Sequence, residues 1–163
     1  RQRQICIRDR LKGALAVSLL FVGVFSSSMT IARECVSDYE LYSKAQVDAA
    51  EYIEKNTAEK AVFLTGDNHN NAVAALTGRS IVCGADTFLY YHGINTAERK
   101  NEVANMYADP VGNKELYKKY NVSYIFVSDV ETGEFQINFE GLGQIAEKVY
   151  DAQNVVIYKC NEL

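Results

Sequence analysis

The stretch 61-AVFLTGDNHNN-71 decides the fold, because it joins an unbroken apolar run to a dense group of polar side chains. A continuous apolar run is typical of a strand that is buried on both faces of a parallel sheet. Aspartate and asparagine accept hydrogen bonds from the free backbone amides at the start of a helix. We therefore predict a buried strand, a turn, and a helix that begins at Asn70 or Asn71 and ends before Gly78.

The segments on either side of this stretch alternate between helical and strand patterns. Ser43 and Gln46 have the spacing of a capping box. The buried-strand pattern returns in 122-VSYIFVS-128. The other expected elements are a helix over 43–56, a short strand over 80–84, an aromatic-rich segment over 86–93, helices over 95–108, 113–121 and 142–146, and a hairpin of strands 147–150 and 155–159. This order predicts the α/β class, with a mainly parallel open sheet, flanking helices and a C-terminal antiparallel hairpin.

Residues 13–32 contain no charged side chain. A helix of that length spans roughly 30 Å, which matches the hydrocarbon core of a bilayer. Residues 1–12 are basic, and the positive-inside rule keeps such a flank in the cytoplasm. We therefore expect a cytoplasmic flank over 1–12, a transmembrane helix over 13–32, a connector over 33–42, and an extracytoplasmic α/β domain over 43–163 at the cell membrane.

A cleaved signal peptide is the alternative for the same apolar run. The basic flank suits a signal sequence, and 26-SSS-28 or 30-TIA-32 offers the small residues that a signal peptidase requires. A retained anchor is favoured because the apolar run is long. The chain begins at Arg1 without an initiator methionine, so we expect it to be part of a larger protein whose last membrane span is this helix.

The charges and cysteines limit the possible partners and cofactors. Five basic residues and one acidic residue precede Arg33, whereas twelve basic and twenty acidic residues lie from it onward. An acidic domain is a poor partner for nucleic acid, whose phosphates require a basic face. The four cysteines at 6, 35, 83 and 160 lack the CxxC spacing of a zinc site. We expect buried free thiols, with a disulfide between Cys83 and Cys160 as the alternative.

Three interpretations fit the polar loop 66–71. The first is structural, because its side chains can cap a helix without any ligand. The second is a sugar or phosphate site, since this loop and 129–134 are expected at the carboxyl ends of the strands, where ligands bind in open α/β sheets. The candidate ligand-binding residues are Asp67, Asn68, His69, Asn70, Arg79, Tyr91 and His92.

The third interpretation is a metal ion held by Asp67, His69 and His92. It requires the segment before His92 to be a strand beside the strand that ends at Thr65. A lone histidine is more often a hydrogen-bonded turn residue, so we predict no metal site. The chain also lacks GxGxxG, GxxxxGK[ST] and GxSxG, so we predict no cofactor and no catalytic residue.

Three short motifs, 63-FLTGDNHNN-71, 76-LTGR-79 and 92-HGI-94, lie within a longer pattern that covers most of residues 40–160. This pattern resembles the C-terminal soluble domain of polytopic membrane proteins. These proteins are similar to glycosyltransferases that use lipid-linked sugar donors, and are related to the dolichyl-phosphate-mannose protein mannosyltransferases. In such enzymes the catalytic acid lies in an early extracytoplasmic loop between membrane helices, so the resemblance implies no catalytic residue in these 163 residues.

The resemblance implies a non-catalytic extracytoplasmic tail domain of a polytopic, glycosyltransferase-like membrane protein. Its expected partners are the membrane, the remaining transmembrane helices of the parent protein, and a glycan or lipid-linked sugar. The alternative is a membrane-tethered module that binds or senses a small solute through residues 66–71.

Overall fold

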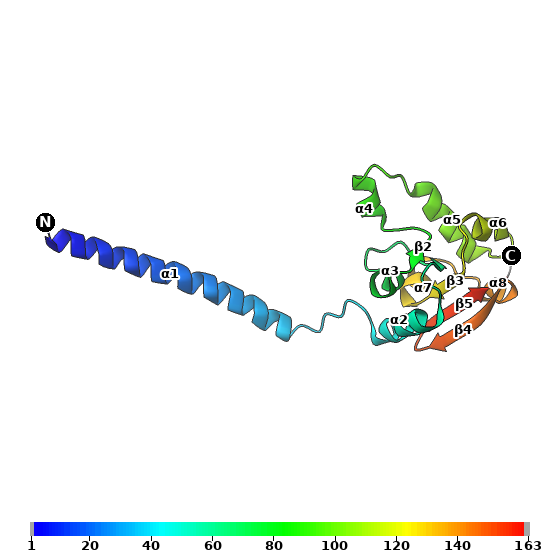
Figure 1. The fold of residues 1–163 in the computed structure, drawn as a ribbon, viewed down its shortest axis with the longest axis horizontal. Helices are drawn as coiled ribbons and strands as arrows, with labels where there is room; N and C mark the ends of the chain where they lie inside the picture. Colours follow the sequence, from blue (N-terminus) through cyan, green and yellow to red (C-terminus); the bar gives the residue numbers. More distant parts are fainter. Residues whose placement is uncertain (1, 162–163) are drawn as a thin grey trace. The chain divides into compact units, whose positions relative to one another are not determined.

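The computed structural model describes residues 2–161, and side chains from Arg10 onward, as two compact units. The first unit extends to Glu40 and consists mainly of the helix α1 (Gln2–Cys35) (Figure 1). Within α1, the segment Arg10–Cys35 is long and apolar enough to cross a membrane, with a mean hydropathy of 2.0 in its most apolar window. The apolar run 13–32 lies inside this segment, and its side chains are exposed.

The unit that begins at Leu41 is built on a five-stranded sheet with the order β2-β1-β3-β5-β4. The strands are β1 (Val62–Leu64), β2 (Ser80–Ile81), β3 (Tyr124–Val127), β4 (Ala146–Ala152) and β5 (Val155–Cys160). Strand β1 is parallel to β2 and β3, whereas β5 is antiparallel to β3 and β4. The predicted α/β class, with parallel pairing in its first part and a C-terminal antiparallel hairpin, is confirmed.

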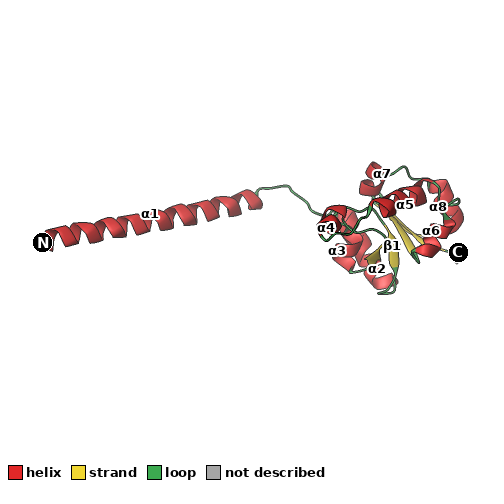
Figure 2. Cartoon of the chain, turned by 90° about the horizontal axis from the view of Figure 1, so that it is seen from above, coloured by secondary structure: helices red, strands yellow, loops and turns green. Residues whose placement is uncertain are grey.

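Helices lie on both sides of the strands (Figure 2). They are α2 (Lys44–Asn56), α3 (Ala72–Thr77), α4 (Asp86–Tyr91), α5 (Ala97–Ala108), α6 (Lys114–Lys119), α7 (Asp129–Glu134) and α8 (Phe139–Ile145). One apolar cluster joins α2 and α3 to the sheet, and the other joins α5, α6 and α8 to it. The buried members of both clusters lie between Ala49 and Tyr158, so the second unit has a core of its own.

The alternation of side chains along β1 and β3 explains why these strands are apolar throughout. Phe63 and Phe126 belong to the cluster with α2 and α3, and Phe63 stacks on Tyr124 with ring centroids 5.0 Å apart. Their neighbours Leu64 and Ile125 point to the opposite face and belong to the other cluster. Successive side chains of a strand point to opposite faces, so a strand covered on both sides needs apolar residues at every position.

The expected helix ends around β1 are confirmed in detail. Ser43 and Gln46 form the predicted capping box of α2, since the backbone N–H of each donates to the side chain of the other. Asn71 is the N-cap of α3, and its Oδ1 accepts from the backbone N–H of Ala74 at 3.1 Å. Gly78 ends α3 with φ of 66°, a left-handed conformation that suits glycine.

Two segments differ from what the sequence suggested. Residues 129–134, expected as a loop, form α7, because Ser128 and Glu131 make a second capping box. The segment 86–93, whose strand character the metal interpretation required, contains the helix α4. Cys83 and Cys160 are free thiols, so the alternative disulfide is absent from the structure.

Tyr107 of α5 ties the helix to the ends of two strands. Its side chain is buried, and its hydroxyl lies 3.2 Å from the carbonyl of Leu64 and 2.8 Å from that of Phe126. A hydroxyl has one proton, so it donates to these carbonyls alternately or shares the proton between them. Its ring stacks on Phe135 at 5.2 Å, which closes the core beside the carboxyl ends of β1 and β3.

We predict that Tyr107→Phe lowers the free energy of unfolding of residues 41–163 by about 1–3 kcal/mol, because the ring remains but buried carbonyls lose their donor. Urea unfolding followed by circular dichroism measures the change. Tyr90→Phe is the matched control, since the Tyr90 side chain is exposed and its substitution should leave the stability unchanged. Equal stability of the Tyr107→Phe variant and the wild type would contradict the role assigned to this hydroxyl.

Candidate functional site

The parallel strands β1, β2 and β3 end at one edge of the sheet, and the polar segments that follow them meet there. Asp67 follows β1, and its side chain is only 10% exposed. Its Oδ2 lies 2.8 Å from Nζ of Lys100, which comes from α5. The same ammonium lies 3.6 Å from Oδ2 of Asp86, which opens α4 after β2. We call Asp67, Asp86, Lys100 and Glu134 the edge cluster.

A buried carboxylate holds the segments after β1 and β3 together. The Glu131 side chain in α7 is 2% exposed, and its Oε1 accepts from the backbone N–H of Gly66 at 3.1 Å. Its Oε2 accepts from both the backbone N–H, at 3.0 Å, and the hydroxyl of Ser128. A Cβ at position 66 would lie 3.3 Å from carboxylate oxygens of Glu131 and Glu134, so glycine permits this close approach.

Asn71 gives the polar loop its shape. Its Nδ2 donates to Oγ1 of Thr65 at 2.9 Å and to the carbonyl of Gly66 at 3.0 Å, while its Oδ1 caps α3. This amide is buried and fully used within the protein. The structural interpretation of the loop therefore holds for Asn71, and it leaves Asp67, Asn68 and His69 as the loop side chains that line the neighbouring hollow.

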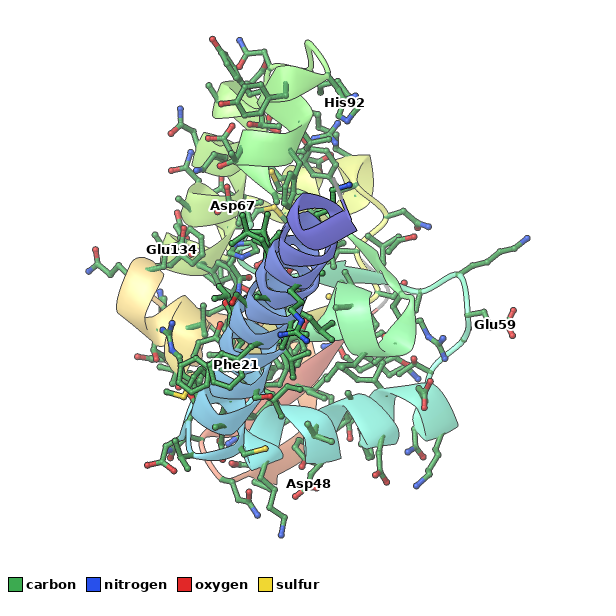
Figure 3. The ribbon with its side chains drawn as sticks, turned by 90° about the vertical axis from the view of Figure 1, so that its left-hand side faces the viewer. Phe21, Asp48, Glu59, Asp67, His92 and Glu134 are labelled. Carbon is green, nitrogen blue, oxygen red and sulfur yellow. The ribbon has the colours of Figure 1, made fainter. Side chains whose placement is uncertain are left out.

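Glu134 brings a second carboxyl group close to Asp67. Figure 3 shows both residues on the same side of the domain. Burial, and next the negative charge of Asp67, raise the pKa of the Glu134 carboxyl above its usual value. The hydrogen bond with Asp67 is the largest cause that raises the pKa of Lys100. The edge cluster thus places one ammonium among three carboxyl groups, one of which resists ionisation.

A hydrogen bond fixes the third carboxyl group of the cluster. The hydroxyl of Thr96 donates to Oδ1 of Asp86 at 2.6 Å. This bond is the largest cause that lowers the pKa of Asp86, and the charge of Lys100 contributes in the same direction. Asp86 therefore stays ionised beside Lys100, while Thr96 holds the start of α4 against the start of α5.

An open hollow of about 450 Å³ adjoins the edge cluster. It is lined by Asp67, Asn68, His69, Ala85, Asp86, Thr87, Phe88 and Lys100. The rings of His69 and Phe88 meet edge to face, with centroids 6.1 Å apart. Carboxylates, an ammonium and an exposed aromatic ring are groups that can hold a hydroxyl-rich ligand through hydrogen bonds and ring contact.

The structure brings only some of the predicted site residues together. Asp67, Asn68 and His69 line the hollow, and Asn70 lies beside it, where its carbonyl accepts from Nδ2 of Asn68 at 3.3 Å. These four residues form one continuous segment at the carboxyl end of β1. The loop therefore supplies a compact part of the candidate site.

Arg79, Tyr91 and His92 lie elsewhere. Arg79 precedes β2 at the opposite edge of the sheet, where its guanidinium donates to the carbonyl of Thr57 at 3.0 Å and to that of Thr77 at 3.1 Å. Tyr91 and His92 are exposed at the end of α4. Figure 3 shows His92 away from Asp67. Arg79 thus connects the C-terminal ends of α2 and α3, and it does not line the hollow.

The metal interpretation loses its geometric basis. His92 caps the end of the helix α4 instead of following a strand beside β1, so it does not converge on Asp67 and His69. In residues 2–161, as far as the structure describes them, no three His, Cys, Asp or Glu side chains gather in a way that could hold a metal ion.

Sequence reasoning missed three members of the edge cluster. Lys100 is one of several charged residues in the segment 95–108 and has no local signal of a site, but its Nζ lies 2.8 Å from Oδ2 of Asp67. Glu134 belongs to the segment 129–134, whose position at the same edge as the polar loop was the available signal. Asp86 had no such signal, because the helix α4 was not anticipated.

Comparisons with known proteins bear on the fold of this chain. No family model matches it, and no curated protein matches its sequence. Its structure is similar to the crystal structure of the C-terminal globular domain of an oligosaccharyltransferase from Archaeoglobus fulgidus, with a TM-score of 0.52 and 10% sequence identity. The similarity covers 74% of this chain and 99% of that domain, so the two share an α/β fold over nearly the whole of the archaeal domain.

We predict that Glu134→Gln stabilises residues 41–163 at pH 7 and has no such effect at pH 4. The raised pKa means that the folded state holds a proton which the unfolded state releases. The protonated Glu134 carboxyl contributes its full stabilisation below about pH 4.3, which is the pKa of a glutamate in the unfolded chain. This contribution is lost as the pH rises through the higher pKa that the carboxyl has in the folded state. Urea unfolding at the two pH values measures the difference.

The same substitution three residues earlier is the matched control. Glu131→Gln removes a carboxylate that accepts from the backbone N–H groups of Gly66 and Ser128, and should destabilise the domain by about 1–3 kcal/mol. If both variants lowered the stability at pH 7, the different environments assigned to Glu131 and Glu134 would be wrong.

Proposed function

We propose that residues 41–163 form the non-catalytic, extracytoplasmic tail domain of a glycosyltransferase-like membrane protein. The observation that carries this proposal is the shared fold with the C-terminal globular domain of an oligosaccharyltransferase, matched over 99% of its length. The segment Arg10–Cys35, which is suited to crossing a membrane, precedes the domain. A tail domain of this kind supports an enzyme whose chemistry takes place in its membrane-embedded part.

The distribution of charge supports the orientation. Basic residues concentrate before the apolar run 13–32, and acidic residues prevail after it. Basic flanks are retained in the cytoplasm, whereas acidic residues have little influence on orientation. On this basis we propose that the domain from Leu41 lies on the outer face of the membrane.

The edge cluster and its hollow are the surface that we assign to a glycan or the sugar of a lipid-linked donor. Asp67, Asn68 and Lys100 offer acceptors and donors to hydroxyl groups, and Phe88 offers a ring face for the apolar side of a sugar. This role is one of holding a substrate rather than of converting it.

Cysteine labelling in sealed membrane vesicles tests the orientation. Glu59 lies in the exposed turn between α2 and β1, so Glu59→Cys places a reactive thiol on the domain (Figure 3). In the full-length chain, with Cys6, Cys35 and Cys160 replaced by serine, we expect a membrane-impermeant maleimide to label this thiol in right-side-out vesicles. The parent without Glu59→Cys is the control, since its remaining Cys83 is buried.

In inverted vesicles the same thiol should react only after detergent is added. Labelling in intact inverted vesicles, combined with protection in right-side-out vesicles, would place the domain in the cytoplasm. That result would contradict the proposed orientation.

A membrane-tethered module for a small solute is the second candidate function, and the hollow beside Asp67 favours it. Calorimetry on residues 41–163 with monosaccharides, inorganic phosphate and divalent cations separates the two candidates. A tail domain should bind none of these probes tightly. Tight binding that Asp67→Asn abolishes, and that the control Asp48→Asn on α2 preserves, would favour the solute module instead (Figure 3).

A further inference from the structure

The end of α4 exposes an apolar and aromatic surface. Phe88, Tyr90, Tyr91 and Ile94 are 58%, 72%, 81% and 51% exposed, and we call these four residues the α4 tip. Residues 87–97 contain no Asp, Glu, Lys or Arg, although acidic residues prevail in the remainder of the domain. An uncharged aromatic surface of this kind on an acidic domain indicates contact with an apolar partner.

The α4 tip is a defined turn. The backbone N–H of Gly93 donates to the carbonyl of Tyr90 at 2.9 Å, and that of Ile94 donates to the carbonyl of Leu89 at 3.0 Å. These two bonds, with φ of 75° at Gly93, form a Schellman motif. The hydroxyl of Thr96 donates a hydrogen bond to Asp86, so the two ends of the segment 86–96 are held together. The motif 92-HGI-94 therefore fixes the direction in which the apolar side chains project.

We propose that the α4 tip inserts into the interfacial region of the lipid bilayer that α1 crosses. This inference rests on the membrane anchoring in the proposed function. Tyrosine is enriched at membrane interfaces, because its ring prefers the apolar side and its hydroxyl prefers the headgroups. Since residues 87–97 carry no formal charge, the segment enters this region without desolvating an ion.

The tether favours lipid over other partners for this surface. Residues 36–43 connect α1 to α2, and an extended segment of eight residues reaches at most about 30 Å. The domain therefore stays close to the bilayer, where the effective concentration of lipid around the tip is high. The excess of acidic residues in the domain disfavours electrostatic attraction to anionic headgroups, so apolar insertion is the contact that we assign.

Tryptophan fluorescence tests this contact directly, because the chain contains no tryptophan. Tyr91→Trp in the full-length chain, reconstituted into phosphatidylcholine vesicles, should emit at shorter wavelength than in a water-exposed site. Brominated acyl chains should quench its emission. Tyr90→Trp provides an independent reporter in the same tip, so the result does not depend on one substitution.

Two further reporters separate the possible failures. Phe21→Trp in α1 reports the anchoring itself, and Phe139→Trp on α8 reports an exposed site elsewhere on the domain. We expect quenching of Phe21→Trp and Tyr91→Trp, and little quenching of Phe139→Trp.

Each other outcome overturns the inference in a distinct way. Quenching of Phe21→Trp without quenching of Tyr91→Trp would refute the tip contact and leave the anchoring intact. An unquenched Phe21→Trp would refute the anchoring and the tip contact together. Equal quenching of Phe139→Trp and Tyr91→Trp would show that the tip has no preference for lipid. A blue shift of Tyr91→Trp that depends on protein concentration, without quenching, would show that a second copy of the chain covers the tip.

Discussion

The buried carboxylate of Glu131 is the constraint on which the candidate site depends. It accepts from Gly66 and Ser128, which follow neighbouring strands and lie far apart in the sequence. A buried charge is costly unless it is hydrogen-bonded, so these bonds must form together with the fold. Once they form, Glu134 lies against Asp67, and the ammonium of Lys100 offsets their mutual repulsion.

Residues that stabilise the fold and residues that we propose to contact a ligand therefore lie at the same edge of the sheet. Open α/β sheets bind ligands outside the carboxyl ends of their strands, and the hollow lies at that edge of the parallel part of this sheet. Its side chains are suited to holding a polar ligand.

The helix α4 connects the two proposals. Asp86 and Phe88 line the hollow, and Phe88 also belongs to the exposed α4 tip. A tip that rests in the bilayer interface would hold the hollow near the headgroups, where the sugar of a lipid-linked donor resides. The membrane contact and the sugar contact would then adjoin each other on one short helix and share Phe88.

The sequence by itself determined the elements whose signals are local. The apolar run 61–65, the capping residue Ser43, an asparagine at 70 or 71 as the next cap, and the turn at Gly78 specify strand and helices through local side-chain and backbone interactions. Only the tertiary structure decided that Lys100 reaches Asp67 while Arg79 binds helix ends at the opposite edge. Such pairings depend on how elements that are far apart in the sequence pack against each other. The residues next to Lys100 or Arg79 in the sequence therefore do not predict them.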